Sequence, residues 1–328
     1  MAPEKLALAS SNHTPVTKFI LLGFSDYPEL QELLFGTFLT SMTVAGNLGM
    51  MPLICTDSGL HSPMYFFLGV LSFLDICYSS VVTPKLLVNF LASDKPISVD
   101  GCVVQLTFFV VHVTAESFLL ASMVYDCFVP ICQPLHYGSV MTQGTCLQLV
   151  AASYAFGGAN SAIQTGNVFA LPFCGPNRVT HYSCDIPPLF HLACADTARA
   201  ETVLYAFSAL VTLLPTVVIL ISYSLVLVAI GKMHSTAGRE KALSTCASHF
   251  LVVAIFYGTV VFTYVQPHGS NDQSVTNGQV VSVFYTVVIP MLNPFKYSLR
   301  NNKVKFARQR KLQASIFPRM RPASLSVG

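Results

Sequence analysis

The chain has 328 residues, of which 53% are hydrophobic and only 10% are charged, and its formal net charge is +3. Soluble domains carry about 25% charged residues, so this composition excludes an ordinary water-soluble domain and indicates a protein whose solvent is the lipid bilayer. Nine of the 18 basic residues follow Tyr285. Beside so many apolar segments, such a basic tail indicates contact with a membrane surface and not with nucleic acid.

Seven apolar stretches are long enough to cross a bilayer, which takes about 20 residues of helix. A mixed, polar segment over residues 1–30 precedes them, and its Asn12-His-Thr14 matches the acceptor sequence for N-glycosylation. A basic segment over residues 300–328 follows them. The predicted transmembrane helices cover residues 31–55, 64–90, 102–131, 146–170, 201–231, 242–265 and 275–299.

The fourth predicted helix has an unusually polar second half, which includes Gly157, Asn160, Gln164 and Gly166. Small residues of this kind allow two helices to approach closely within a membrane. We therefore expect this half of the helix to pack tightly against a neighbouring helix.

The distribution of lysine and arginine predicts the orientation of the helices. With seven spans, the two ends of the chain face opposite sides of the membrane. Twelve lysine and arginine residues fall on the side of the C-terminal tail, and six fall on the side of the N-terminal segment. Because cytoplasmic segments carry the excess of these residues, we expect the N-terminal segment outside the cell and the tail in the cytoplasm.

Four sequence motifs occur in order along these helices. They are Leu60-His-Ser-Pro-Met-Tyr-Phe-Phe-Leu68, Met123-Val-Tyr-Asp-Cys-Phe-Val-Pro-Ile-Cys-Gln-Pro-Leu-His-Tyr137, Lys241-Ala-Leu-Ser-Thr-Cys-Ala-Ser-His249 and Pro290-Met-Leu-Asn-Pro-Phe-Lys-Tyr-Ser-Leu-Arg-Asn301. The ordered set resembles the odorant receptor family of class A G-protein-coupled receptors. The resemblance implies an all-α fold, a bundle of seven transmembrane helices over residues 31–299, located in the plasma membrane.

Four of the ten cysteines lie on the predicted outer side: Cys102 at the start of the third helix, and Cys174, Cys184 and Cys194 in the connection between the fourth and fifth helices. Disulfides form in that oxidising compartment. Four cysteines allow three pairings, and their spacing does not choose among them. The resemblance implies the pairs Cys102–Cys184 and Cys174–Cys194.

The third predicted helix carries one charged residue, Glu116, in its apolar middle. At 100° per residue, Phe109, Val113, Glu116, Leu120 and Cys127 share one face, and a charged side chain within a membrane points into the bundle. This inward stripe is either plain helix packing or the wall of a ligand pocket.

The resemblance favours a pocket, and it implies wall residues on four helices. They are Phe109, Val110, Val113, Thr114, Phe207, Tyr257, Val260, Val261, Tyr264, Val283 and Thr286. These side chains are apolar or aromatic with a few hydroxyls, and none is charged. We therefore expect a small, uncharged, hydrophobic odorant, with the hydroxyl of Thr114 or of a tyrosine holding its polar group.

Asp75 and Glu116 form a second candidate site, because the fold that the resemblance implies makes them neighbours. Two carboxylates facing one dry interior cannot both ionise cheaply, so one takes a proton or the two share a cation. A sodium ion bound by the pair and a protonated, hydrogen-bonded pair are the two alternatives. We expect no other cofactor.

The resemblance assigns coupling to a heterotrimeric G protein to residues at the inner end of the bundle. They are Asp126, Cys127, Tyr223, Asn293, Pro294 and Tyr297. Cys127 stands where the family carries arginine, and a thiol lacks both the five donors and the permanent charge of a guanidinium. Two hypotheses follow. The protein either signals through the stimulatory olfactory G protein to cyclic AMP, or it binds odorants without coupling.

Other classes of protein find little support. No catalytic motif occurs, so we do not expect an enzyme. His181-Tyr-Ser-Cys-Asp185 gathers three types of metal ligand, but a disulfide at Cys184 would remove the thiolate, so we expect no metal site there. A transporter or channel would need a continuous polar pathway or broken helices, which the isolated acidic pair does not supply.

Overall fold

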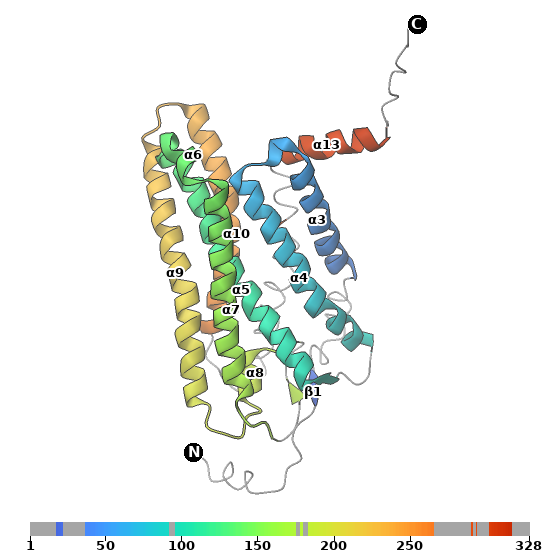
Figure 1. Cartoon of the computed structure of the whole chain (residues 1–328). Helices are drawn as coiled ribbons and strands as arrows, with labels where there is room; N and C mark the ends of the chain where they lie inside the picture. The colour runs from blue at the N-terminus through green and yellow to red at the C-terminus, as the bar shows by residue number, and fades with distance from the viewer. Residues whose placement is uncertain are drawn as a thin grey trace.

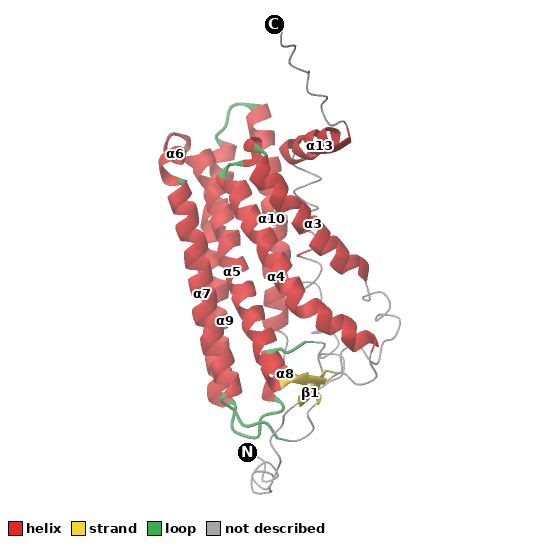
Figure 2. Ribbon diagram, turned by 45° about the vertical axis from the view of Figure 1, so that its right-hand side comes forward, coloured by secondary structure: helices red, strands yellow, loops and turns green. Residues whose placement is uncertain are grey.

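The computed structural model describes residues 18–21, 37–91, 96–174, 178–179, 183–265, 290, 293 and 302–316. These residues form a bundle of long helices with a small sheet at one end (Figures 1 and 2). The long helices are α3 (Thr37–Thr56), α4 (Pro63–Leu91), α5 (Val99–Cys132), α7 (Gln143–Phe169), α9 (Ala198–Gly231), α10 (Thr236–Val265) and α13 (Asn302–Ile316).

Helix α5 is the centre of the bundle, because it packs against α4, α7, α9 and α10. Its first turn is fixed by Ser98, whose Oγ accepts a hydrogen bond of 3.0 Å from the Gly101 N–H. Asp100 also lies in that turn, where a negative charge is favourable to the helix dipole. The first six predicted helices correspond, in order, to α3, α4, α5, α7, α9 and α10.

Three described helical segments are long and apolar enough to cross a membrane: Pro63–Val81, Val99–Cys132 and Ala198–Gly231. Met42–Thr56 is a shorter apolar segment. The outer face of α9 exposes large apolar side chains such as Leu213, which is 60% exposed, and such a surface suits contact with lipid. The predicted helix over 275–299 lies outside the described residues, except for Pro290 and Asn293.

A three-stranded sheet closes one end of the bundle, with strand order β2-β1-β3. Strand β1 (Lys18–Leu21) pairs antiparallel with β2 (Pro96–Ser98) and parallel with β3 (Arg178–Val179). Phe19 of β1 is fully buried and meets the Phe173 ring edge-on at a centroid distance of 5.5 Å. The all-α expectation missed this sheet, because strands of two to four residues carry no usable periodicity.

Two disulfides hold the loop before α9. Cys102 in the first turn of α5 pairs with Cys184, with their Cα atoms 5.5 Å apart, and Cys174 pairs with Cys194 at 5.8 Å. These are the pairs that the resemblance implies. Short helix α8 (Ile186–Phe190) follows Cys184, and its Ile186 is buried beside α5.

The opposite end of the bundle carries η1 (Ser58–Leu60), η2 (Pro134–His136), α6 (Tyr137–Val140) and the crosswise helix α13 (Figures 1 and 2). Val304 and Ala307 of α13 are fully buried, so this helix packs on the bundle and is not a detached tail.

Candidate functional site

A cavity with about 510 Å³ of empty space lies between α5, α7, α9 and α10, next to α8. Helix α5 contributes Phe109, Val110, Val113 and Thr114 to its wall, and α10 contributes Tyr257. The structure thus brings five of the predicted pocket residues together around one cavity.

The other predicted pocket residues either do not line this cavity or are not described by the structure. Phe207 does not line the cavity, whereas its neighbours Leu204, Ser208 and Val211 do, because the inward face of α9 is rotated away from Phe207. The structure does not describe the side chains of Val260, Val261 and Tyr264. Val283 and Thr286 lie entirely outside the described residues.

Helix α7 supplies two wall residues that were not predicted, Asn160 and Gln164. Their signal was present in the polar half of the fourth predicted helix, which we interpreted as a helix-packing surface. Gly157 on the same helix does serve packing, because an added Cβ there would lie 2.8 Å from the Val111 carbonyl oxygen of α5. The same segment therefore combines a close helix contact with a polar cavity wall.

The hydroxyls at one side of the cavity are joined to each other. Ser117 Oγ and Tyr257 OH lie 3.0 Å apart, and Ser117 Oγ reaches the Val211 carbonyl oxygen at 3.2 Å. Tyr257 OH also donates to the Ser117 carbonyl oxygen at 3.2 Å. These bonds connect α5, α9 and α10. A ligand that contacts Tyr257 would therefore contact a hydrogen-bond network shared by three helices.

Asp75 and Glu116 line one smaller cavity, with about 290 Å³ of empty space, together with Tyr78, His112 and Pro290. Asn293 Nδ2 donates to Asp75 Oδ2 at 3.1 Å. Glu116 Oε1 and Asn293 Oδ1 are buried with no hydrogen-bond partner in the described part of the chain. Such oxygens can accept from a protonated group or contact a cation.

Asn47 of α3 ties the seventh segment to the bundle, since its Nδ2 donates to the Pro290 carbonyl oxygen at 3.2 Å. Where the structure describes the chain, no group of three histidine, cysteine, aspartate or glutamate residues could hold a metal ion. His181, one of the candidate ligands, lies outside the described residues.

A third cavity opens at the end of the bundle that carries α6, with about 1,020 Å³ of empty space. Asp126, Cys127 and Tyr137 lie in its wall, and Cys127 is only 8% exposed. Tyr137 OH donates to Asp126 Oδ1 at 3.0 Å. Burial, with Asp126 close by, raises the pKa of the Tyr137 hydroxyl well above its usual range, so this group stays protonated and remains a donor.

The remaining predicted coupling residues are only partly described. Tyr223 is buried and meets the Phe250 ring edge-on at 5.6 Å. Asn293 contacts Asp75, as stated above, whereas Pro294 and Tyr297 lie outside the described residues. The glycosylation candidate Asn12 also lies outside them.

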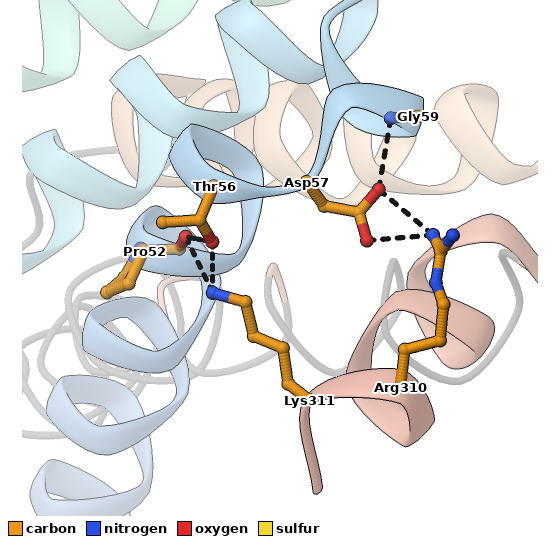
Figure 3. A network of polar contacts seen from close by, with 6 residues as sticks. All are labelled: Pro52, Thr56, Asp57, Gly59, Arg310 and Lys311. Carbon is orange, nitrogen blue, oxygen red and sulfur yellow. Dashed lines mark hydrogen bonds and ion pairs between the residues drawn. The ribbon is translucent and has the colours of Figure 1, made fainter. Parts of the chain in front are cut away.

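Helix α13 is held to the α3–α4 connection by polar contacts (Figure 3). Arg310 Nη2 lies 2.8 Å and 3.0 Å from the two carboxylate oxygens of Asp57, and Asp57 Oδ1 accepts from the Gly59 N–H at 3.0 Å. Lys311 Nζ reaches Thr56 Oγ1 and, at 3.4 Å, the Pro52 carbonyl oxygen. Part of the basic tail therefore binds the protein itself.

Comparisons with known proteins agree on one family. The family model for olfactory receptors matches residues 37–314. Olfactory receptor 5AP2 of Mus musculus is 51% identical over 302 residues, which cover 92% of this chain and 95% of that protein. Olfactory receptor 5B12 of Homo sapiens is 50% identical, with 93% and 98% covered, and olfactory receptor 8A1 of Homo sapiens is 46% identical, with 96% of both covered.

Proposed function

The chain belongs to the olfactory receptor family of G-protein-coupled receptors, and we propose that it binds small, uncharged, hydrophobic odorants in the cavity between α5, α7, α9 and α10. The observation that carries this proposal is the lining of the cavity. Phe109, Val110, Val113 and Phe256 give it apolar walls, and Thr114, Ser117 and Tyr257 add hydroxyls. Among the described lining residues none is charged, so a charged amine or acid would find no counter-ion.

We propose further that seven helices span the plasma membrane, with the N-terminal segment outside and the tail in the cytoplasm. The three long apolar helices support this topology. So does the position of β1 at the end of the bundle opposite to α13, as Figure 1 shows. The two disulfides at the β1 end fit an oxidising, extracellular side. We propose an N-terminal segment over 1–30, a receptor domain over 31–299 and a tail over 300–328. Asn12 on the outer segment is the proposed site of glycosylation.

Signalling would follow from a population shift. An odorant that binds the active arrangement of the bundle more tightly moves the receptor toward that arrangement, and the cavity at the inner end then accepts a heterotrimeric G protein. We propose the stimulatory olfactory type, which raises cyclic AMP. Asp126, Cys127 and Tyr137 lie in the wall of this cavity, which supports a role for them in coupling.

Cys127 supports a second form of the proposal, in which the receptor binds odorants but couples poorly. The side chain is buried beside Asp126 and carries no positive charge that could reach a partner protein. The hydrogen bond from Tyr137 holds Asp126 in place without the arginine.

We also propose that Asp75 and Glu116 bind a sodium ion, with Asn293 as the neighbouring amide. The buried oxygens of Glu116 and Asn293, which have no partner among the described residues, support a cation there. A protonated acid pair is the competing arrangement. Thermal unfolding of the purified receptor at constant ionic strength separates the two, because only the first predicts a higher Tm in sodium than in choline chloride.

The experiment that tests receptor function measures odorant-evoked cyclic AMP in cells expressing the chain as given or Cys127→Arg at matched surface levels. A response from the unchanged chain supports coupling through Cys127. A response from Cys127→Arg alone supports the weakly coupling form. No response from either, with both at the surface and a broad panel of neutral odorants, would overturn the proposal.

A further inference from the structure

Two amide side chains stand on adjacent turns of α7 at the wall of the odorant cavity. Asn160 and Gln164 are four residues apart and therefore share one face of the helix. Both line the cavity, and they are 9% and 2% exposed. A buried amide inside a membrane protein is unfavourable unless its donors and acceptors are used.

One N–H donor of each amide is already used. Gln164 Nε2 faces the Leu204 carbonyl oxygen at 3.5 Å, and Asn160 Nδ2 donates to Thr114 Oγ1 at 3.0 Å. A backbone carbonyl can only accept, so the Gln164 amide must turn its NH2 group toward Leu204 and its oxygen away.

The acceptor side of each amide is not used. Asn160 Oδ1 and Gln164 Oε1 are both buried with no hydrogen-bond partner among the described residues. By contrast, the hydroxyls of Ser117 and Tyr257 are joined to each other and to backbone carbonyl oxygens. Each NH2 group uses one of its two N–H donors, whereas each amide oxygen has no partner among the described residues, so the cavity presents two buried acceptors to a ligand that carries a donor.

We propose that the odorant carries a hydroxyl group, as an alcohol or a phenol, and donates its proton to Gln164 Oε1, with Asn160 Oδ1 as the neighbouring acceptor. This inference rests on the proposed odorant function of the cavity. The donor has to be neutral, because no described lining residue could balance an ammonium group. Ethers, ketones and esters of the same shape bring only acceptors, so they leave both amide oxygens bare.

The test is a set of matched pairs, each a primary alcohol and the methyl ether of equal chain length. Binding to the purified full-length receptor is measured by ligand-induced thermal stabilisation, which does not depend on G-protein coupling. The unchanged receptor is expected to bind each alcohol about tenfold more tightly than its ether, since an unsatisfied buried acceptor weakens binding by that order.

Two variants locate the preference. Gln164→Met and Asn160→Leu keep similar volume and remove the amide, so each is expected to reduce the preference for an alcohol over its ether severalfold. Gln148→Met is the matched control, because Gln148 lies exposed on the same helix, and it should keep the full preference.

The outcomes separate this inference from the function on which it rests. Equal binding of alcohols and ethers by the unchanged receptor overturns the hydroxyl preference and leaves the odorant cavity standing. A preference that survives both amide substitutions also overturns it, because other groups would then serve the hydroxyl. If no member of the panel binds, both the proposed odorant cavity and the inferred hydroxyl preference are refuted.

Discussion

Tyr137, at the start of α6, donates a hydrogen bond of 3.0 Å to the buried carboxylate of Asp126 on α5. The residue after Asp126 is Cys127, where the resembling family has arginine. The carboxylate near the C-terminal end of α5 is therefore held by a phenol from the short helix α6. This bond joins the core of the bundle to α6, whose Gly138 and Ser139 are exposed.

Tyr137→Phe is expected to destabilise the receptor by about 1–3 kcal/mol, because Asp126 would lose this hydrogen bond while staying buried. Thermal unfolding of the purified receptor measures the effect. Tyr125→Phe is the matched control, since its ring stacks on Phe128 and the ring is retained. Equal Tm values for the two variants would show that the Tyr137 hydroxyl contributes nothing.

Gly157→Ala is expected to lower stability by about 1–3 kcal/mol relative to Gly158→Ala. An added Cβ at Gly157 would lie 2.8 Å from the Val111 carbonyl oxygen, so α5 and α7 must separate, whereas an added Cβ at Gly158 meets nothing within 4 Å. Both changes gain the same helix propensity, so their difference isolates the contact. Surface expression and Tm are measured, and equal values would refute the close approach.

Val110→Phe is expected to raise the odorant concentration needed for half-maximal binding at least tenfold. Val110 is 7% exposed and lines the cavity, so a larger ring there occupies ligand space. Val104→Phe provides the control, because Val104 on the same helix is 51% exposed and faces away from the core. Unchanged affinity in a well-folded Val110→Phe receptor would place the ligand elsewhere.

Asp57→Ala is expected to cost more stability than Arg310→Ala. Arg310 is 66% exposed, and such a surface ion pair contributes less than about 1 kcal/mol. Asp57 is 11% exposed and also accepts from the Gly59 N–H, a capping bond that contributes about 1 kcal/mol by itself. The Tm loss of Arg310→Ala should shrink in high salt, and part of the Asp57→Ala loss should remain. Identical salt dependence of the two variants would contradict this division.

Much of the cavity wall could be predicted from the third helix. A single charged residue in an apolar helix shows which face points inward, and the helical period then places Phe109 and Val113 on that face. Helix α9 offers no such signal, since it carries no charged residue after Glu201. Its rotation could not be predicted, and Phe207 was chosen where Leu204 and Ser208 line the cavity.

Asn160 and Gln164 were missed for a different reason. Polar residues in an apolar helix fit both a helix contact and a cavity wall, and one sequence does not separate the two. Only the packing of α7 against α5 decided it, because Gly157 makes the contact and the two amides reach past it to the cavity.

The sequence by itself determined that the bilayer is the solvent, which segments form long helices, and the family to which they belong, because hydropathy, helical period and motif order are local properties of the chain. The tertiary structure alone decided which distant residues meet. Arg310 reaches Asp57 across 253 positions, three short strands from separate loops form one sheet, and Tyr137 holds Asp126. These contacts depend on how whole helices pack, and no local pattern in the sequence carries that information.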